Sequence, residues 1–576
     1  MKRRLILSTI ALSLAVLSSP ITAQQPDSGG SRRARRPVVA GRSMVITKLG
    51  IVATSHPLAS SAGVQILEQG GNAIDAAIAA NATLGLTEPM MNGVGGDLFA
   101  IIYIASENKL YGLNSAGWAS TGLTPELLAS RQVTRLTGAY SVTVPGAVAG
   151  WHVLRERFGK LPFSTILKPA MYHAENGFPV TEVVAGGWGS GFQSPTARAT
   201  YLIDGRAPQM GDIFRNPDYA RTLQRIAERG RDGFYTGPVA SAIVAAVNEG
   251  GNPMTLADLR DFQPEWVTPI QTSYRGWTVY ELGAPTQGVA ALMMLNLMEQ
   301  YPLADWGFQS TRTMHAMIEA KKLAYADMLR YVADPRVSTI PMEQMLSKPR
   351  AAERAKLIDP AKAACEVQPG RLAGVTDSEG SETIYLSVID KDGNIVSLIE
   401  SIYSSWGSRI VPSGGGFALH NRGGLFTLTP GQPNTLAPRK RPLHTLIPGF
   451  MEKDGVRIGF GIMGGWNQSQ AHAQFVSNIA DYGMTIQEAL EAGRFTKGSF
   501  EGCDVSVEHL VADSVRTQLT ALGHRISVPR PRAGSFGWGQ AVMSMPNGVH
   551  YGASEPRHDG AALPEQAPVF RTPGGR

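Results

Sequence analysis

Apolar residues alternate with other residues from position 383 to 390, which is the pattern of a β-strand. Asp392-Gly393 then suits the positive φ angles of a tight turn, and a second apolar run follows at 395–402. The pattern predicts an antiparallel hairpin. Helical periodicity with capping residues also predicts helices at about 60–68, 72–84, 146–158, 311–332 and 468–482.

The predicted hairpin places Thr383 opposite about residue 402, so Ser401 and Tyr403 lie within one residue of it. The segment before it, residues 374–382, is polar, glycine-bearing and without period, as a loop would be. A loop that ends at a threonine opening a strand suggests a cleavage site. Cleavage before Thr383 would give an N-terminal threonine whose α-amine can take the proton of its own hydroxyl. The alternative is an ordinary strand threonine, which is common in β-sheets.

A second candidate element follows the strand predicted at 457–462. Met463-Gly464-Gly465 leads directly into the helix predicted from about residue 468. Backbone amides at a helix start are positive, and a glycine pair there can approach the oxyanion that forms in acyl transfer. The segment Gly459–Gly464 also fits G-x-G-x-x-G, but a dinucleotide site would need a following strand with an acidic end.

The N-terminal segment and the composition of the chain indicate an exported globular protein. Residues 1–23 have a basic start, a short apolar core and a small residue at the end, which predicts a signal peptide, with a membrane anchor as the alternative. Residues 24–44 are polar and basic and predict a disordered spacer. These segments contribute much of the net charge of +6, so we expect neither a nucleic-acid nor a membrane partner. The expected location is periplasmic or secreted.

The chain contains two cysteines, Cys365 and Cys503, without a C-x-x-C arrangement, which argues against a zinc or redox site. An oxidising compartment permits a disulfide between them but does not require one. Because they lie on opposite sides of Thr383, such a bond would tie the two products of cleavage together.

Several short motifs give the sequence a resemblance to the γ-glutamyltransferase family of N-terminal-nucleophile hydrolases. They occur in the family's order along most of the chain. The matching segments are Ser55–Gly63, Gly70–Ala77, Gly93–Asp97, Pro145–Trp151, Thr383–Asn394, Asn434–Pro442 and Met463–Gly465.

The resemblance implies a fold and a catalytic apparatus. The fold would be a four-layer α/β/β/α sandwich, self-cleaved into a large subunit of residues 45–382 and a small subunit of residues 383–576. Thr383 would be the nucleophile, Ser401 the hydroxyl that supports it, and Gly464 and Gly465 the oxyanion donors. No cofactor is expected.

The substrate side departs from the family pattern. The family's carboxylate-binding arginine is missing from Leu113–Trp118, and the aspartate that holds the α-amino group is replaced by Leu425. Arg422 either supplies a replacement cation for a carboxylate or faces solvent. The expected substrate-binding residues are Tyr403, Asn421, Arg422, His444 and Thr445. The link after Phe426 is short, so the lid loop of many family members is expected to be absent.

The resemblance implies a γ-glutamyl amide substrate such as glutathione, with transfer to water or an amine. The departures fit the divergent branch of acylases and small-amide hydrolases, so a different acyl group is the alternative. A further alternative is an unprocessed periplasmic binding protein that has kept only the fold.

Self-cleavage can be tested by intact mass. The protein without its signal is expected to yield a fragment of residues 383–576, because the free α-amine of Thr383 is created by cleavage there. Thr383→Ala is expected to stay one chain. A stable single chain in both proteins would contradict self-processing and favour the binding protein.

Overall fold

A computed structural model describes residues 41–367, 381–531 and 534–569. The predicted signal peptide, most of the spacer and most of the loop before Thr383 lie outside these residues. The end of the spacer, residues 41–44, has no regular secondary structure, and Arg42 donates hydrogen bonds from its side chain to the carbonyl of Gly560 (2.8 Å) and from its backbone to Glu491 (2.7 Å).

Two seven-stranded sheets form the centre of the described chain. The order in the first sheet is β19 (Ala561–Pro564), β2 (Ile51–Thr54), β10 (Ser381–Ile389), β11 (Ile395–Ser404), β3 (Asp97–Ile104), β4 (Lys109–Ser115) and β7 (Glu265–Val267). The order in the second is β1 (Val45–Thr47), β18 (His550–Ser554), β17 (Gly539–Ser544), β13 (Val456–Ile462), β12 (Gly449–Lys453), β9 (Trp277–Glu281) and β8 (Ile270–Tyr274). Neighbouring strands are antiparallel throughout both sheets.

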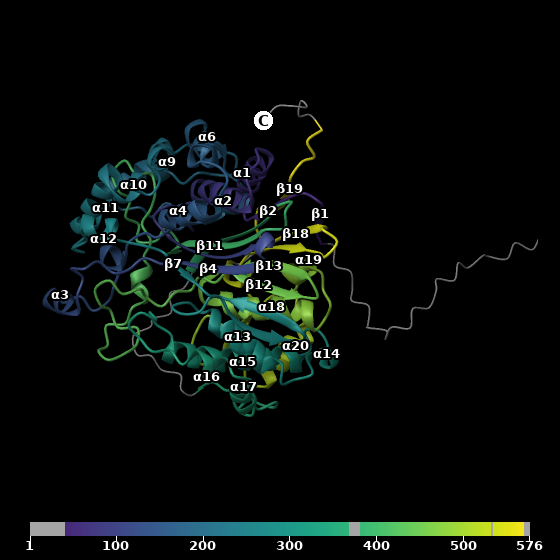
Figure 1. Ribbon diagram of the computed structural model, residues 1–576. Coiled ribbons are helices and arrows are strands. Elements are labelled where there is room, and N and C mark those ends of the chain that lie inside the picture. The colour runs from purple at the N-terminus through teal and green to yellow at the C-terminus, as the bar shows by residue number, and fades with distance from the viewer. Residues whose placement is uncertain (1–40, 368–380, 532–533, 570–576) are drawn as a thin grey trace, which may run out of the picture. The chain divides into compact units, whose positions relative to one another are not determined.

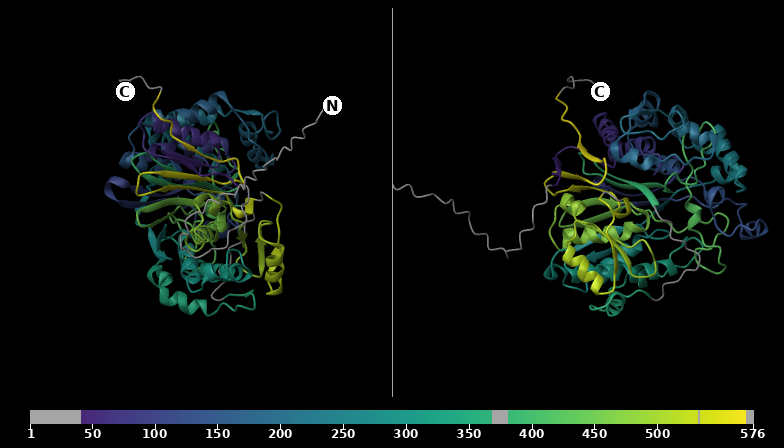
Figure 2. Two further views of the ribbon diagram at one scale, coloured as in Figure 1. Left: turned by 90° about the vertical axis from the view of Figure 1, so that its right-hand side faces the viewer. Right: turned by 180° about the vertical axis from the view of Figure 1, so that it is seen from behind.

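The sheets pack face to face, with β10 against β17 and β13, and helices cover their outer sides (Figure 1). The first sheet is covered by α1 (Pro57–Glu68), α2 (Ala73–Thr87) and α4 (Ala147–Phe158). The second is covered by α13 (Gly288–Met298) and α18 (Gln468–Ala480), with α15 (Thr311–Tyr331) packed on α13. Figure 2 shows the same order of layers from two other sides. The predicted α/β/β/α sandwich is confirmed.

The remaining elements surround these layers. The helices are α3 (Pro125–Ser130), α5 (Phe163–Ile166), α6 (Lys168–Asn176), α7 (Glu182–Trp188), α8 (Pro195–Tyr201), α9 (Pro217–Arg229), α10 (Asp232–Tyr235), α11 (Gly237–Glu249), α12 (Leu256–Arg260), α14 (Leu303–Trp306), α16 (Met342–Leu346), α17 (Lys348–Ala355), α19 (Ile486–Glu491) and α20 (Asp513–Ala521). The 3₁₀ helices are η1 (Ala105–Glu107), η2 (Gly138–Ser141), η3 (Arg422–Leu425), η4 (Gly465–Asn467) and η5 (Gly534–Phe536). Smaller sheets contain β5 (Phe178–Pro179) with β6 (Ile213–Phe214), and β14 (Phe495–Thr496) with β15 (Asp504–Val507) and β16 (Arg525–Ser527).

The predicted hairpin is formed by β10 and β11, with one difference in register. Ile384 pairs with Glu400, whereas Glu382 pairs with Tyr403, so the ladder shifts at Thr383. An extra residue in one strand is a β-bulge, which interrupts pairing and redirects side chains. Thr383 therefore lies at an irregularity rather than directly opposite residue 402.

The hairpin turn is tied to the helix layer. Gly393 has a φ of +84°, as the Asp-Gly signal predicted, and Asp390 accepts hydrogen bonds from the amides of Asp392 and Asn394 (both 3.0 Å). The second Asp390 oxygen accepts from the amide of Ala73 at the start of α2 (3.0 Å). A carboxylate is stabilised at a helix N-terminus, so this residue fixes β10 against α2.

Two glycines of the motif Gly459–Gly464, Gly459 and Gly461, have a packing role at the interface of the two sheets. A Cβ on Gly461 would lie 2.4 Å from the ring of Tyr385, and one on Gly459 would lie 2.6 Å from Ile395. Residues 458–462 of β13 are buried, so no side chain fits at these two positions. The close packing of the two sheets explains the glycines at positions 459 and 461. β13 pairs only with antiparallel neighbours, whereas a dinucleotide-binding unit has parallel strands.

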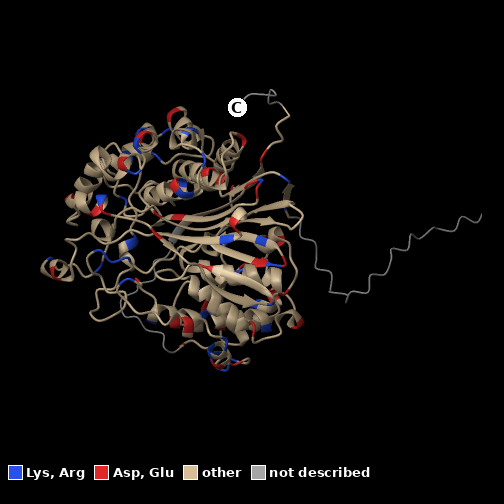
Figure 3. Cartoon of the chain, in the orientation of Figure 1, with Lys and Arg blue, Asp and Glu red and all other residues tan. Residues whose placement is uncertain are grey.

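Charged residues lie mainly on the outer helices and loops, where basic and acidic side chains are interspersed, while the strands are largely uncharged (Figure 3). Within the described ranges, no helix is both long and apolar enough to cross a membrane.

Cys365 and Cys503 form a disulfide, which settles the pairing that the sequence left open. The first sheet also combines strands from both sides of Thr383, since β2, β3, β4 and β7 precede it and β11 and β19 follow it. The two predicted subunits are thus joined covalently and through a shared sheet.

The disulfide predicts the behaviour of the cleaved protein on a denaturing gel. The two fragments are expected to run as one species without reductant and as two with it, because Cys365 and Cys503 lie on opposite sides of Thr383. Cys503→Ser should separate the fragments in both lanes. Separation of the unreduced wild-type fragments would contradict the pairing.

Candidate active site

Thr383 is fully buried opposite the bulge, whose extra residue lies in β11, and its hydroxyl donates a hydrogen bond to Ser401 Oγ (3.2 Å). Ser401 Oγ also accepts from the backbone amide of Tyr403 (2.7 Å). The structure therefore brings together the hydroxyl pair that the hairpin predicted. Ser401 is held in place by its own strand and can orient the Thr383 hydroxyl.

Backbone strain is present directly beside this pair. Tyr403 has a φ of +78°, which is unfavourable for a residue with a large side chain. Asn421 holds the same strand end, because its side chain accepts from the amide of Ser404 and donates to the Ser404 hydroxyl, both at 3.0 Å. Strained residues cluster at functional sites. Asn421 thus stabilises the end of β11, and its predicted contact with substrate stays a prediction.

The glycine pair lies at the end of β13, and η4 packs against β10. Gly464 and Gly465 have φ angles of +123° and +55°, which favour glycine. Neither amide donates a hydrogen bond to another residue that the structure describes. Amides without a partner beside the nucleophile strand suit the predicted oxyanion site.

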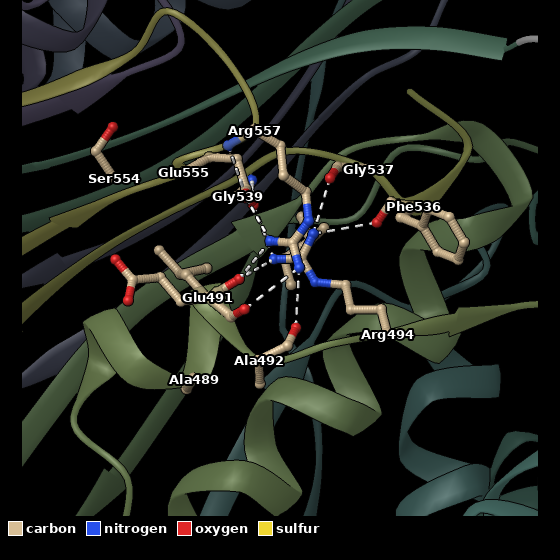
Figure 4. A network of polar contacts seen from close by, with 12 residues as sticks. Ala489, Glu491, Ala492, Arg494, Phe536, Gly537, Gly539, Ser554, Glu555 and Arg557 are labelled. Carbon is tan, nitrogen blue, oxygen red and sulfur yellow. Dashed lines mark hydrogen bonds and ion pairs between the residues drawn. The ribbon is translucent and has the colours of Figure 1, made fainter. Parts of the chain in front are cut away.

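A buried ion-pair network supports the loop that packs on Gly464 (Figure 4). Arg494 donates to the carbonyls of Phe536 (3.1 Å) and Gly537 (2.8 Å) and forms an ion pair with Glu555 (2.8 Å). A Cβ on Gly464 would lie 3.2 Å from the Cα of Gly537, so the loop and the glycine pair are in close contact.

Further members complete this network. Glu555 accepts from the amide of Gly539 (3.0 Å) and pairs with Arg557 (2.6 Å), which also pairs with Glu508 (2.7 Å). Burial favours the neutral acid, but the two arginines lower the pKa of Glu555. The network is therefore ionised and holds residues 536–539 in place.

Arg422 is fully buried, which excludes the alternative that it faces solvent. Its Nη1 donates to Thr445 Oγ1 (2.7 Å), and its guanidinium lies 4.4 Å from the centre of the Tyr403 ring. Its Nε and Nη2 have no hydrogen-bond partner among the described residues. Burial lowers the pKa of Arg422 to about 10, so the group is still a cation at neutral pH.

Next to Arg422, His444 and Asp97 form a buried pair. Burial lowers the pKa of His444 to about 3, so its ring is neutral. Its Nδ1 accepts from the amide of Leu446 (3.3 Å), so the proton is on Nε2, which donates to Asp97 (3.2 Å). Asp97 also accepts from the amides of Gly117 (2.9 Å) and Gly146 (3.2 Å).

Asp97 is the residue of this group that the sequence did not single out. It ends the motif Gly93–Asp97, but its partners lie 20 to 347 positions away in the chain. The sequence feature that could have identified it is an acidic residue at the start of an apolar strand.

One buried cluster has the composition of a metal site. The ligand atoms of His315, Glu319 and His524 lie within 4.8 Å of one another. However, Lys322 Nζ already lies 2.6 Å from Glu319 Oε1, and His315 is hydrogen-bonded to His524 (2.8 Å). The ammonium balances the carboxylate, so we interpret the cluster as a structural link between α15 and β16.

A cavity of about 720 Å³ lies beside η3 and is lined mainly by residues 125–137 and 424–430. Neither Thr383 nor Arg422 contributes to its walls, so we do not assign the substrate to it.

Two antiparallel sheets packed between helices, with a buried threonine near the start of β10 and a glycine pair next to that strand, are the features of an N-terminal-nucleophile hydrolase. The family model described as Gamma-glutamyltranspeptidase matches residues 59–565, and the chain belongs to this family of amidases.

Three relatives illustrate the range of the family. The chain is 34% identical to the glutathione hydrolase-like YwrD proenzyme of Bacillus subtilis, covering 91% of this chain and 99% of the relative. It is 32% identical to the oxamate amidohydrolase proenzyme of Klebsiella pneumoniae, covering 89% and 98%. The solved cephalosporin acylase from Bacillus halodurans superimposes with a TM-score of 0.84 at 38% identity, covering 93% of this chain and all of that one.

Removing the charge of Arg494 tests the ion-pair network. Arg494→Met leaves Glu555 with one partner fewer in a buried site, so we expect the free energy of unfolding to fall by about 3–5 kcal/mol. Urea denaturation in a Thr383→Ala background keeps the chain whole for the measurement. Arg530→Met, at an exposed position, is the control, and an equal effect of the two substitutions would contradict the role of the network.

Proposed function

We propose that the protein hydrolyses amides whose acyl group carries a carboxylate. The observation that supports this proposal is the buried Arg422, which keeps two nitrogen atoms without a partner. Buried donors without partners are costly, and a carboxylate would satisfy both at once. Tyr403 connects this cation to the nucleophile, because its ring faces Arg422 and its backbone pairs with Glu382.

The chemistry follows from the positions of the other groups. Thr383 Oγ attacks the amide carbonyl and gives its proton to the α-amine that cleavage creates. The amides of Gly464 and Gly465 stabilise the oxyanion, and Ser401 orients the attacking hydroxyl. The leaving amine takes the proton, and an ester on Thr383 remains. Water then attacks this ester by the same steps and releases the acid.

The surroundings of Arg422 favour an acyl group without an α-amino group. The position of the family aspartate is occupied by Leu425, which is buried and apolar. The nearby carboxylate of Asp97 already binds two backbone amides and His444. An ammonium on the substrate would thus lack an acidic partner, and oxamate, named in one relative, is a carboxylate without such a group.

The second candidate is a γ-glutamyl amide such as glutathione, with transfer to water or an amine. The family model and the glutathione hydrolase-like relative favour it. Arg422 would then bind the α-carboxylate of the γ-glutamyl group.

Maturation and location belong to the same proposal. The relatives from Bacillus subtilis and Klebsiella pneumoniae are both named proenzymes, which supports cleavage before Thr383 into the subunits 45–382 and 383–576. Export to the periplasm or medium is supported by the apolar segment within residues 1–23 and by the disulfide of Cys365 with Cys503.

Chromogenic anilides distinguish the candidates. The wild type is expected to prefer glutaryl-p-nitroanilide over γ-glutamyl-p-nitroanilide. Arg422→Met should lower kcat/KM for the glutaryl donor by roughly 10- to 150-fold, because a hydrogen-bonded charge contributes about 1.5–3 kcal/mol. Arg422→Lys should recover only part of this loss, since an ammonium cannot bind a carboxylate through a planar fork.

Butyryl-p-nitroanilide, which has no carboxylate, is the control donor and should be far less sensitive to Arg422→Met. A wild-type preference for the γ-glutamyl donor would favour the second candidate. Equal losses for both the glutaryl and the butyryl donor would contradict carboxylate binding by Arg422.

A further inference from the structure

Gln287 connects two separate parts of the site. It precedes α13, in the segment that follows β9, and is fully buried. Its side-chain Nε2 donates to the carbonyl of Thr445 (2.6 Å) and to the carbonyl of Gly465 (2.6 Å). Both amide hydrogens are therefore used, and each goes to a residue of the site.

The orientation of this amide is fixed by the two carbonyls. Carbonyl oxygens can only accept hydrogen bonds, so the side-chain atom between Thr445 and Gly465 must be the nitrogen. On the other side, Gln287 Oε1 lies 3.2 Å from the Tyr325 hydroxyl and 3.0 Å from the Ser469 hydroxyl. These hydroxyls have closer acceptors in the carbonyls of Trp466 and of Gln287 itself, respectively, so they support the amide without setting its orientation.

The backbone of the same segment strengthens the contact. The amide of Gln287 donates to the carbonyl of His444 (3.1 Å), and the amide of His444 donates to the carbonyl of Pro285 (2.7 Å). The segment therefore holds residues 444–445 through both its backbone and its side chain.

Each carbonyl belongs to a residue with a defined place in the site. The Thr445 hydroxyl accepts the hydrogen bond of Arg422, so the position of Thr445 helps to set that of the cation. Gly465 has a φ of +55° and belongs to the glycine pair that faces β10. One buried amide thus spans the carboxylate-binding side and the oxyanion side.

We propose that Gln287 is a positioning residue that sets the spacing between Arg422 and the amides of Gly464 and Gly465. This role rests on the proposed function. A fixed spacing between a carboxylate-binding cation and the oxyanion amides selects acyl groups by the number of carbons between their carboxylate and the scissile carbonyl. Gln287 thereby determines acyl-chain length, although it contacts neither end of the acyl group. The large subunit contributes it, so the length preference requires both subunits.

A series of donors tests this role. Succinyl, glutaryl and adipoyl p-nitroanilides differ by one methylene each, and wild-type kcat/KM should peak at one length. Gln287→Met keeps the length of the side chain but removes its hydrogen bonds. We expect it to lower the ratio of kcat/KM between the best donor and its neighbours by about tenfold, because each lost hydrogen bond loosens one of the two ends. Gln300→Met, exposed just after the same helix, is the matched control.

The ratio of kcat/KM between the best donor and its neighbours in length distinguishes a positioning role from a general loss of folded enzyme. Loss of folded enzyme lowers kcat/KM for every donor by the same factor and leaves the ratio unchanged, so an unchanged ratio in Gln287→Met would overturn the proposal. Gln287→Glu provides a second readout. Its new carboxyl can donate a hydrogen bond only when protonated, so the length preference should recover toward low pH relative to the wild type, and a flat preference across pH would count against the role.

The two proposals fail in different ways. A wild type that hydrolyses none of the three donors overturns the proposed function and this role with it. A wild type with a clear length preference that Gln287→Met leaves intact overturns the role of Gln287 alone.

Discussion

The site depends on how closely the two sheets approach each other. At Gly459 and Gly461 a single methyl group would collide with the side chains of Ile395 on β11 and Tyr385 on β10, so these glycines allow the side chains of one sheet to pack onto the backbone of the other. Because the sheets are this close, the end of β13 delivers Gly464 and Gly465 to the strand that carries Thr383. Interiors are packed too densely to absorb an added side chain without movement. Spreading the sheets here would separate Thr383 from the glycine pair that is proposed to bind the oxyanion.

The buried cation places a second constraint on the interior. Desolvation of a guanidinium is unfavourable, and here it is offset only in part by the Tyr403 ring, the Thr445 hydroxyl and the nearby Asp97. Two of its nitrogens remain unsatisfied. A site built in this way discriminates strongly, because a ligand without an acceptor leaves those donors unpaired. Under the proposed function, this arrangement would select against uncharged acyl groups.

The sequence was most informative where structure is local. Three features were predictable because each depends on a few neighbouring residues. They are the β10–β11 hairpin, the start of α2, which Asn72 caps, and the glycine pair before α18. The bulge at Thr383 was not, because the register of a hairpin can shift without changing its pattern.

Burial of Arg422 and the contacts of Asp97 and Gln287 depend on segments at least 20 positions away in the chain. Such long-range contacts leave no periodic pattern of apolar and polar residues in the sequence. In the motif Gly459–Gly464, Gly459 and Gly461 serve the packing of the two sheets, and this role is visible only in the fold.

The first sheet contains strands from both sides of Thr383, which bears on whether folding or cleavage comes first. Strand β10 lies between β2, from before Thr383, and β11, from after it. Two separate chains would have to find each other and interleave their strands, whereas one chain forms this sheet intramolecularly. The proposed cleavage before Thr383 would therefore follow folding, and the Cys365–Cys503 disulfide would then replace the peptide bond as the covalent link between the two parts.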